Sequence, residues 1–176
     1  MRVVMDVGIA ATVTGDRGRR VKPGGERSNA EIFESLYPSL RRFAAMCAPL
    51  SVEPDDLLQE AVARTLRAGP LRELDNPAGY LRVAIVNIAK NLYRVEARRE
   101  LSGVVEEVAE DDYPSDLGVL DELNAIERAA VYLVDVEGYS YRAAARTVGC
   151  SVPALRSRLA RARRHIRNAY KLESTQ

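Results

Sequence analysis

Residues 140–171 read SYRAAARTVGCSVPALRSRLARARRHIRNAYK and contain two apolar patterns of helical period on either side of a turn. Ser140 is a suitable N-cap for a short helix over 141–148, and the Gly-Cys-Ser sequence at 149–151 predicts a tight turn. Over 152–170 the apolar residues recur every three or four positions, which predicts a longer second helix. A short helix, a three-residue turn with glycine and a longer helix together form a helix-turn-helix.

The second of these helices is strongly basic. Between residues 152 and 171 it carries seven Arg and Lys side chains and no Asp or Glu. Like charges without interspersed acids repel one another, so this pattern favours a helix that binds an anion such as DNA. In a helix-turn-helix the start of the second helix faces base edges, while cations further along meet phosphates. We therefore predict Arg156 and Ser157 as base readers, Arg163, Arg164 and Arg167 as backbone contacts, and Arg158 and Arg161 as further members of the DNA-binding set.

Charge is distributed unevenly along the 176 residues, although the net charge is only +1. Residues 101–123 carry eight acids and no Lys or Arg, whereas residues 124–176 carry ten basic and four acidic side chains. A clustered basic segment is the electrostatic footprint of a nucleic-acid-binding domain. The acidic stretch over 101–116 is predicted to be a flexible linker that leaves the parts on either side independently placed.

Three further helices are predicted before the acidic stretch. Apolar side chains recur with helical period over 32–47, 57–66 and 80–92. Pro54 and Pro77 each suit the first turn of a helix, and Ser28 or Asn29 can cap the first one. No strand pattern and no internal repeat is found. The fold class is therefore predicted to be all-α.

The pattern divides the chain into four parts. Residues 1–27 hold little that could be buried and are predicted to be a disordered tail. Residues 28–100 form one small helical domain, residues 101–116 the acidic linker, and residues 117–171 a second small domain that contains the helix-turn-helix.

The sequence contains no pattern for catalysis, a cofactor or a metal site. The only cysteines, Cys47 and Cys150, are far apart without a CxxC pair, and the single histidine, His165, lies among arginines. No nucleophile–base pair or glycine-rich phosphate loop can be assembled, so we predict that the protein is not an enzyme. No apolar stretch is long enough to cross a membrane and no signal peptide is convincing, which predicts no membrane insertion and a cytoplasmic location.

Three stretches around the helix-turn-helix resemble region 4 of the extracytoplasmic-function (ECF) RNA polymerase sigma factors. They are EGYSY at 137–141, GCS at 149–151 and LRSRLARAR at 155–163. The chain departs from the family pattern at Ala143-Ala144, where Glu-Ile is usual, and at Asn124, where Pro is usual. The first change removes a capping-box partner from the short helix. None of these changes removes a cation that faces DNA.

Two stretches of the N-terminal half resemble region 2 of the same family. They are DDLLQE at 55–60 and YLRVAIVNIAKN at 80–91, the latter followed by a basic helix end. The resemblance implies that this region docks on basic helices of core RNA polymerase and holds the minus-ten element as melted single strand. The implied polymerase-binding residues are Asp56, Gln59 and Glu60. The implied minus-ten DNA-binding residues are Asn87, Lys90, Asn91, Arg98 and Arg99.

The resemblance covers about residues 28–170 and implies an ECF-type sigma factor. Such a protein binds core RNA polymerase and directs promoter recognition, DNA melting and initiation, with region 4 reading the minus-thirty-five element as duplex. The implied partners are core RNA polymerase and promoter DNA, with an anti-sigma factor as a further candidate. The residues alone leave two alternatives open. A stand-alone helix-turn-helix transcriptional regulator would explain the basic helix but not the acidic helix that carries DDLLQE at 55–60. A protein that only titrates a partner would not need the complete arginine set.

Overall fold

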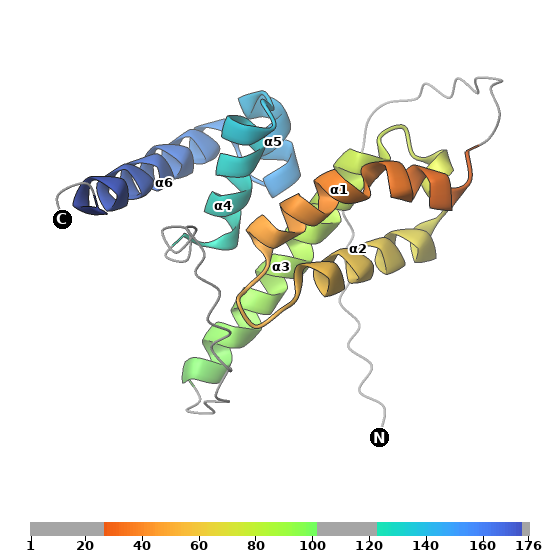
Figure 1. Ribbon diagram of the computed structural model, residues 1–176, viewed down its shortest axis with the longest axis horizontal. Helices are drawn as coiled ribbons and strands as arrows, with labels where there is room; N and C mark the ends of the chain where they lie inside the picture. The colour runs from red at the N-terminus through yellow and green to blue at the C-terminus, as the bar shows by residue number, and fades with distance from the viewer. Residues whose placement is uncertain (1–26, 102–122, 174–176) are drawn as a thin grey trace.

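The computed structural model describes residues 27–101 and 123–173, and all regular structure within these ranges is helical. The predicted all-α fold is confirmed. The helices form two groups (Figure 1). The N-terminal group consists of α1 (Asn29–Cys47), α2 (Pro54–Ala68), the 3-10 turn η1 (Leu71–Glu73) and α3 (Pro77–Leu101). The C-terminal group consists of α4 (Ala125–Val131), the π-helical turn η3 (Tyr132–Val136), α5 (Tyr141–Val148) and α6 (Val152–Glu173).

Local sequence explains where the helices begin and end. At α1, Ser28 Oγ accepts a hydrogen bond from the N–H of Glu31 (3.2 Å), and Glu31 Oε2 accepts one from the N–H of Ser28 (2.7 Å), which is a capping box. At α5, Ser140 Oγ accepts from the N–H of Ala143, where alanine cannot return the bond. Between α5 and α6, Gly149 has a φ of 70°, a left-handed conformation that glycine adopts without a side-chain clash.

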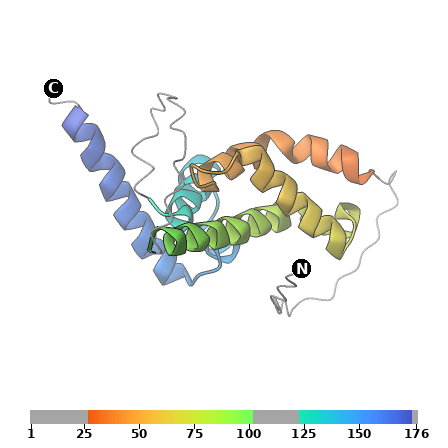
Figure 2. The same ribbon diagram turned by 90° about the horizontal axis from the view of Figure 1, so that it is seen from below.

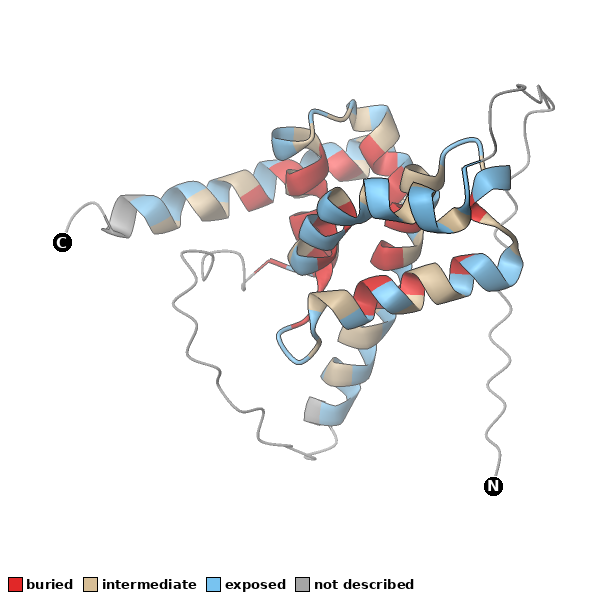
Figure 3. Ribbon diagram, turned by 45° about the vertical axis from the view of Figure 1, so that its right-hand side comes forward, coloured by how far each residue is buried: buried red, intermediate tan, exposed pale blue. Residues whose placement is uncertain are grey.

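The three helices of the N-terminal group pack around a shared apolar core. Leu40 and Phe43 of α1, Leu57 of α2 and Ile85 of α3 are at most 1% exposed. Burying a side chain of this size contributes about 1.5–3 kcal/mol. Figure 3 shows the buried residues on the facing sides of the helices and the exposed residues outside. Apolar burial therefore holds α1, α2 and α3 together.

In the C-terminal group, α6 packs against α4 along a narrow apolar stripe. The stripe consists of Leu155, Leu159 and Ala162, which are at most 1% exposed and follow the spacing of one helix face. After Ala162, none of the α6 side chains described is buried. This second part of α6 extends away from the rest of the molecule (Figures 1 and 2). Its side chains are therefore open to a partner.

The two groups are in contact, which differs from the expectation that they are independently placed. Residues of both groups belong to one apolar cluster, in which the rings of Phe43 and Tyr132 lie 5.8 Å apart. Polar contacts also cross this interface between the halves: Arg82 Nη2 lies 2.8 Å from Glu137 Oε1. The expectation of independent placement followed from the composition of the acidic stretch alone. The structure shows instead that α1 and α3 each have a second buried side, which faces α4 and α5.

Several predictions concern residues outside the described part of the chain. The disordered tail at 1–27 and the acidic linker at 101–116 fall almost entirely within residues 1–26 and 102–122. The domain boundaries at 28–100 and 117–171 stay predictions. Among the helices that the structure describes, none has the length and apolar character needed to cross a membrane.

Candidate nucleic-acid interface

The predicted DNA-binding side chains of α6 differ in burial and in their partners within the chain. Each residue of an α-helix is rotated by about 100° from the one before it. Arg158 and Arg163 consequently lie about 70° to either side of the apolar stripe and are partly buried, whereas Arg161 lies further round the helix, is exposed and pairs with Glu127. The other set is exposed and makes no hydrogen bond or ion pair with the described residues: Arg156, Ser157, Arg164 and Arg167. The structure therefore divides the predicted minus-thirty-five set in two.

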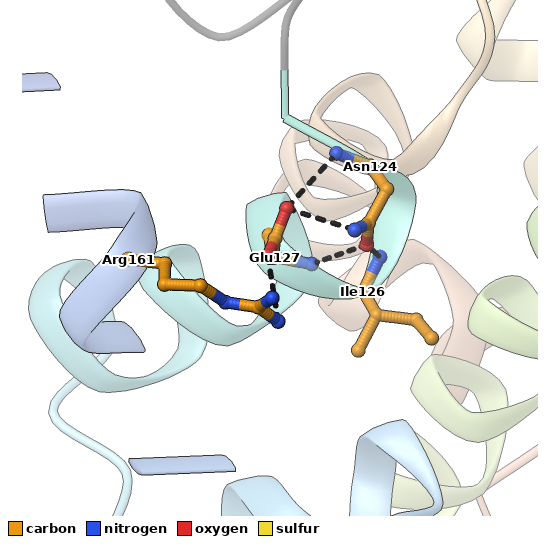
Figure 4. A network of polar contacts seen from close by, with 4 residues as sticks. All are labelled: Asn124, Ile126, Glu127 and Arg161. Atoms are coloured by element: carbon orange, nitrogen blue, oxygen red, sulfur yellow. Dashed lines mark hydrogen bonds and ion pairs between the residues drawn. The ribbon is translucent and has the colours of Figure 1, made fainter. Parts of the chain in front are cut away.

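Arg161 is bound by Glu127, which is 9% exposed on α4. Its Nη2 lies 3.4 Å from Glu127 Oε1 (Figure 4). Glu127 Oε2 accepts hydrogen bonds from the side-chain amide of Asn124 (2.8 Å) and from its backbone N–H (3.4 Å). Asn124 Oδ1 in turn accepts from the N–H groups of Ile126 and Glu127. Asn124, where the family usually has Pro, is thus the N-cap of α4 and helps hold the carboxylate that Arg161 contacts.

Arg163 is bound more extensively than any other cation of α6 that the structure describes. Its Nε and Nη2 lie 3.1 and 2.5 Å from the two carboxylate oxygens of Asp135 in η3, a bidentate arrangement. Its Nη1 donates to Tyr141 Oη over 3.5 Å. The hydrogen bonds with Asp135 and then with Tyr141 raise the pKa of Arg163. All three guanidinium nitrogens therefore have partners within the chain.

Tyr141, the first residue of α5, contacts two arginines of α6. Its hydroxyl accepts from Arg163, and its ring lies 5.7 Å from the guanidinium carbon of Arg156, within the range of a cation–π contact. Arg156 is exposed near the start of α6, where the helix-turn-helix geometry places base-reading residues. One aromatic side chain thus supports Arg156 and is itself held by Arg163.

The predicted minus-ten residues lie on α3. Asn87, Asn91 and Arg98 are exposed and share one side of the helix because they are four and seven positions apart. Arg99 is exposed beside them. Arg94 lies on the same side and donates to Asn91 Oδ1 over 3.4 Å. The spacing of seven from Asn87 was the signal that could have predicted Arg94.

Lys90 differs from the other predicted minus-ten residues because it is half-buried at the interface between the halves. Its Nζ donates to the backbone carbonyl of Val148 at the end of α5, over 2.6 Å. Burial lowers the pKa of Lys90. The electrostatic effect of Cys150 raises this pKa, and the positive charges of Arg158 and Arg94 lower it. A predicted minus-ten residue thus contacts the C-terminal group, in which the predicted minus-thirty-five residues lie.

The acidic face of α2 is separate from these cations. Asp56 and Gln59 are exposed and have no hydrogen-bond or ion-pair partner among the described residues. Glu60 Oε1 lies 2.6 Å from Arg64 Nε, and its Oε2 lies 3.9 Å from Arg67 Nη2. Figures 1 and 2 both show α2 and α6 on opposite sides of the molecule. The predicted polymerase-binding and minus-thirty-five residues therefore occupy different surfaces.

Asp55, next to this face, is held within the N-terminal group. It accepts hydrogen bonds from Tyr37 Oη (2.8 Å) and Arg41 Nε (3.0 Å) of α1. These bonds, first that from Tyr37 and then that from Arg41, lower the pKa of Asp55. Of the neighbouring acids at the start of α2, Asp55 thus has an internal role and Asp56 is available to a partner.

Sequence reasoning did not find Asp135 or Tyr141 as part of this site. The contacts of Arg163 join residues 28 and 22 positions apart, which no local pattern records. Asp135 also lies in the π-helical turn η3, for which the sequence has no recognisable signal. Among the described residues no group of three or more His, Cys, Asp or Glu could hold a metal ion.

Comparison with known proteins gives concordant similarities. Residues 117–166 match the family model described as Sigma-70, region 4. The chain is 32% identical over 147 residues to the ECF RNA polymerase sigma factor EcfG of Rhodopseudomonas palustris, which covers 73% of this chain and 77% of the relative. It is 29% identical over 164 residues to the ECF RNA polymerase sigma factor SigM of Mycobacterium tuberculosis, covering 88% and 79%.

Two solved structures have a similar fold. The sigma factor RpoE of Bartonella quintana, solved in complex with the anti-sigma factor NepR, has a TM-score of 0.65 and 26% identity, covering 81% of this chain and 96% of that one. CnrH, solved in complex with the cytosolic domain of CnrY, has a TM-score of 0.56 and 22% identity, covering 82% and 88%. The second likeness concerns the fold alone.

Proposed function

Because the chain belongs to the ECF RNA polymerase sigma factors, we propose that it binds core RNA polymerase and directs it to specific promoters. In this proposal α6 reads the minus-thirty-five element as duplex, and α3 holds the minus-ten element as melted single strand. The protein is not an enzyme; phosphodiester synthesis belongs to the polymerase. The proposed partners are core polymerase, promoter DNA and an anti-sigma factor such as the one bound to the RpoE relative.

The observation that carries the proposal is the exposed set on α6. Arg156, Ser157, Arg164 and Arg167 have no hydrogen-bond or ion-pair partner among the described residues. Arg156 and Ser157, near the start of the helix, are proposed to contact base edges, and Arg164 and Arg167 to contact phosphates. Of the remaining cations of the predicted set, Arg161 and Arg163 pair with carboxylates of the chain, and Arg158 is partly buried.

On α3 we propose that unstacked bases and the DNA backbone contact the side defined by Asn87, Asn91, Arg98 and Arg99. Single-stranded DNA is bound by basic channels that also offer polar groups to base edges. Lys90 belongs to the same side, but its ammonium donates to Val148. Contact of Lys90 with DNA therefore requires exchange of that hydrogen bond.

Run-off transcription with core polymerase on a library of genomic fragments tests the function directly. We expect transcripts that start at a limited set of sites and require the protein. A stand-alone regulator, the competing proposal, would bind duplex DNA as well without core polymerase as with it, and would not support initiation. That result would overturn the sigma-factor function.

The acidic face of α2 is proposed to dock on basic helices of core polymerase through Asp56, Gln59 and Glu60. Replacing both Asp56 and Glu60 with Lys should abolish copurification with core polymerase, because like charges facing one another cost several kcal/mol. Circular dichroism should show unchanged helical content. A matched control replaces Glu34 of α1 and Glu73 of η1, two other exposed acids of the N-terminal group, with Lys. Normal copurification of the α2 variant would disprove the docking site.

A further inference from the structure

Three contacts connect Asp135, Arg163, Tyr141 and Arg156 in series. The carboxylate of Asp135 holds two nitrogens of Arg163, the third nitrogen of Arg163 donates to the Tyr141 hydroxyl, and the Tyr141 ring lies against the Arg156 guanidinium. These residues come from η3, α5 and α6, so the series joins η3 to both helices of the helix-turn-helix.

We propose that Asp135, Arg163 and Tyr141 are positioning residues that orient Arg156 for reading the minus-thirty-five element. This inference rests on the proposed function, since it presupposes that Arg156 contacts a base. It assigns Arg163 to Tyr141 and Asp135, and not to a DNA phosphate as its position in the basic helix predicts. It also makes Tyr141 a determinant of promoter selectivity without a base contact of its own.

The geometry favours this role over phosphate binding for Arg163. A bidentate pair between guanidinium and carboxylate fixes both groups in one plane and uses the donors that a phosphate would need. Arg163 would have to give up Asp135 to contact DNA. Arg164, its neighbour on α6, is exposed and has no hydrogen-bond or ion-pair partner among the described residues. The two adjacent arginines are therefore a matched comparison.

The position of Tyr141 explains why its ring matters for selectivity. An exposed Arg side chain has many rotamers, and each must be lost when a base is bound. A flat ring beside the guanidinium reduces that freedom before DNA arrives, which lowers the entropy lost on binding. A bidentate contact from arginine to guanine identifies the base, whereas a contact to phosphate carries no sequence information. Loss of the ring should thus lower sequence preference more than affinity.

The test uses holoenzyme assembled from the full chain and core polymerase. The probes are the minus-thirty-five sequence that wild-type holoenzyme selects from a randomised duplex library and a scrambled version of it. Tyr141→Leu should lower the preference for the selected sequence about two- to fivefold, as expected for loss of a cation–π contact. Tyr141→Phe, which keeps the ring, should retain most of the preference. Arg142→Ala, an exposed neighbour, is the control that should change nothing.

A double-mutant cycle separates positioning from a general structural effect. Arg156→Ala should lower the preference by about five- to 150-fold, and adding Tyr141→Leu to it should cause no further loss. Additive losses would overturn the inference. Binding to the scrambled sequence, which should stay near wild type in Tyr141→Leu, reports that the variant is folded.

Salt dependence distinguishes the two adjacent arginines. Arg164→Ala should flatten the plot of log affinity against log salt by about one unit of slope, because one phosphate contact is lost. Arg163→Ala should change this slope by less than half as much while lowering the sequence preference. Equal slope changes for both variants would overturn the inference. If Arg156→Ala kept the full preference, the reading role proposed for α6 would fail as well.

Discussion

The interface between the halves and the contacts of α6 with α4 and η3 both use arginine, but in different surroundings. At the interface, the side chains of Arg82 and Glu137 are 7% and 14% exposed. On α6, the side chains of Arg163 and Arg161 are 41% and 62% exposed although both have carboxylate partners. The difference in burial indicates which arginine contacts are fixed parts of the fold and which remain accessible to solvent.

The physical reason is the cost of leaving a charge without its partner. In water an exposed ion pair gains little, because solvent and salt screen both charges. A buried charge that loses its partner keeps its desolvation cost, so removal of one member is strongly destabilising. Arg82 also lies within 6 Å of the ring centroids of Phe43 and Tyr139, which come from different halves. The arginines at the interface should therefore behave as core residues.

The largest effect is expected for Arg82. We expect Arg82→Ala to lower the free energy of unfolding by about 3–5 kcal/mol, since it leaves Glu137 without its partner at the interface. Denaturant unfolding followed by circular dichroism measures this change. Arg42→Ala, an exposed arginine on α1, is the matched control and should change stability by less than about 0.5 kcal/mol. Similar losses in both variants would refute the distinction between buried and exposed arginines.

A smaller effect is expected when Asp135 is replaced. Asp135→Ala should lower the free energy of unfolding by at most about 1 kcal/mol, because the pair it forms with Arg163 is accessible to solvent. The same unfolding experiment at low and high salt should show that the loss is reduced by salt. A loss as large as that from Arg82→Ala would mean that the α6 contact belongs with the buried class.

The mildest test leaves the sequence unchanged and uses the two cysteines, one in each half. Burial raises the pKa of Cys47 to about 12, so at pH 8 almost no thiolate is present while the protein is folded. Cys150 is partly exposed in the turn before α6. We expect a thiol reagent to label Cys150 and to reach Cys47 only as the protein unfolds, as measured by mass spectrometry over time. Equal labelling rates in native buffer would contradict the buried interface around α1.

Much of the fold could be predicted because its signals are local. Ser28, Ser140 and Gly149 act within three residues of their own positions, and the structure confirms each helix boundary they predict to within a few residues. The capping role of Asn124 was not predicted from the sequence. Asn124 departs from the family pattern, yet its side chain caps α4 and builds a capping box with Glu127. A residue that departs from the family pattern can thus still start the helix correctly.

The relation between the halves could not be predicted, because it depends on residues far apart in the sequence. Arg82 and Glu137 are 55 positions apart, and Lys90 and Val148 are 58 apart. Neither the spacing of the arginines nor the acidic composition of residues 101–116 indicates that these residues pair. For the same reason, the basic pattern of α6 marks its cations as one class, whereas only their partners on α4, η3 and α5 distinguish them. The DNA and polymerase contacts themselves stay predictions.

The projecting part of α6 converts a small tilt of the helix into a larger displacement of its far end. The helix has 22 residues and is therefore about 33 Å long, and its last buried side chain, Ala162, lies near the middle. A tilt of about 10° at that point would displace the far end by about 3 Å, roughly the length of one hydrogen bond. Arg161 and Arg163 make their ion pairs on the two sides of this pivot. The proposed phosphate contacts, Arg164 and Arg167, lie about 3 and 7.5 Å beyond Ala162, so the same tilt would displace them by about 0.5 and 1.3 Å. The angular stiffness at Ala162 therefore sets how accurately the second half of the helix can be positioned.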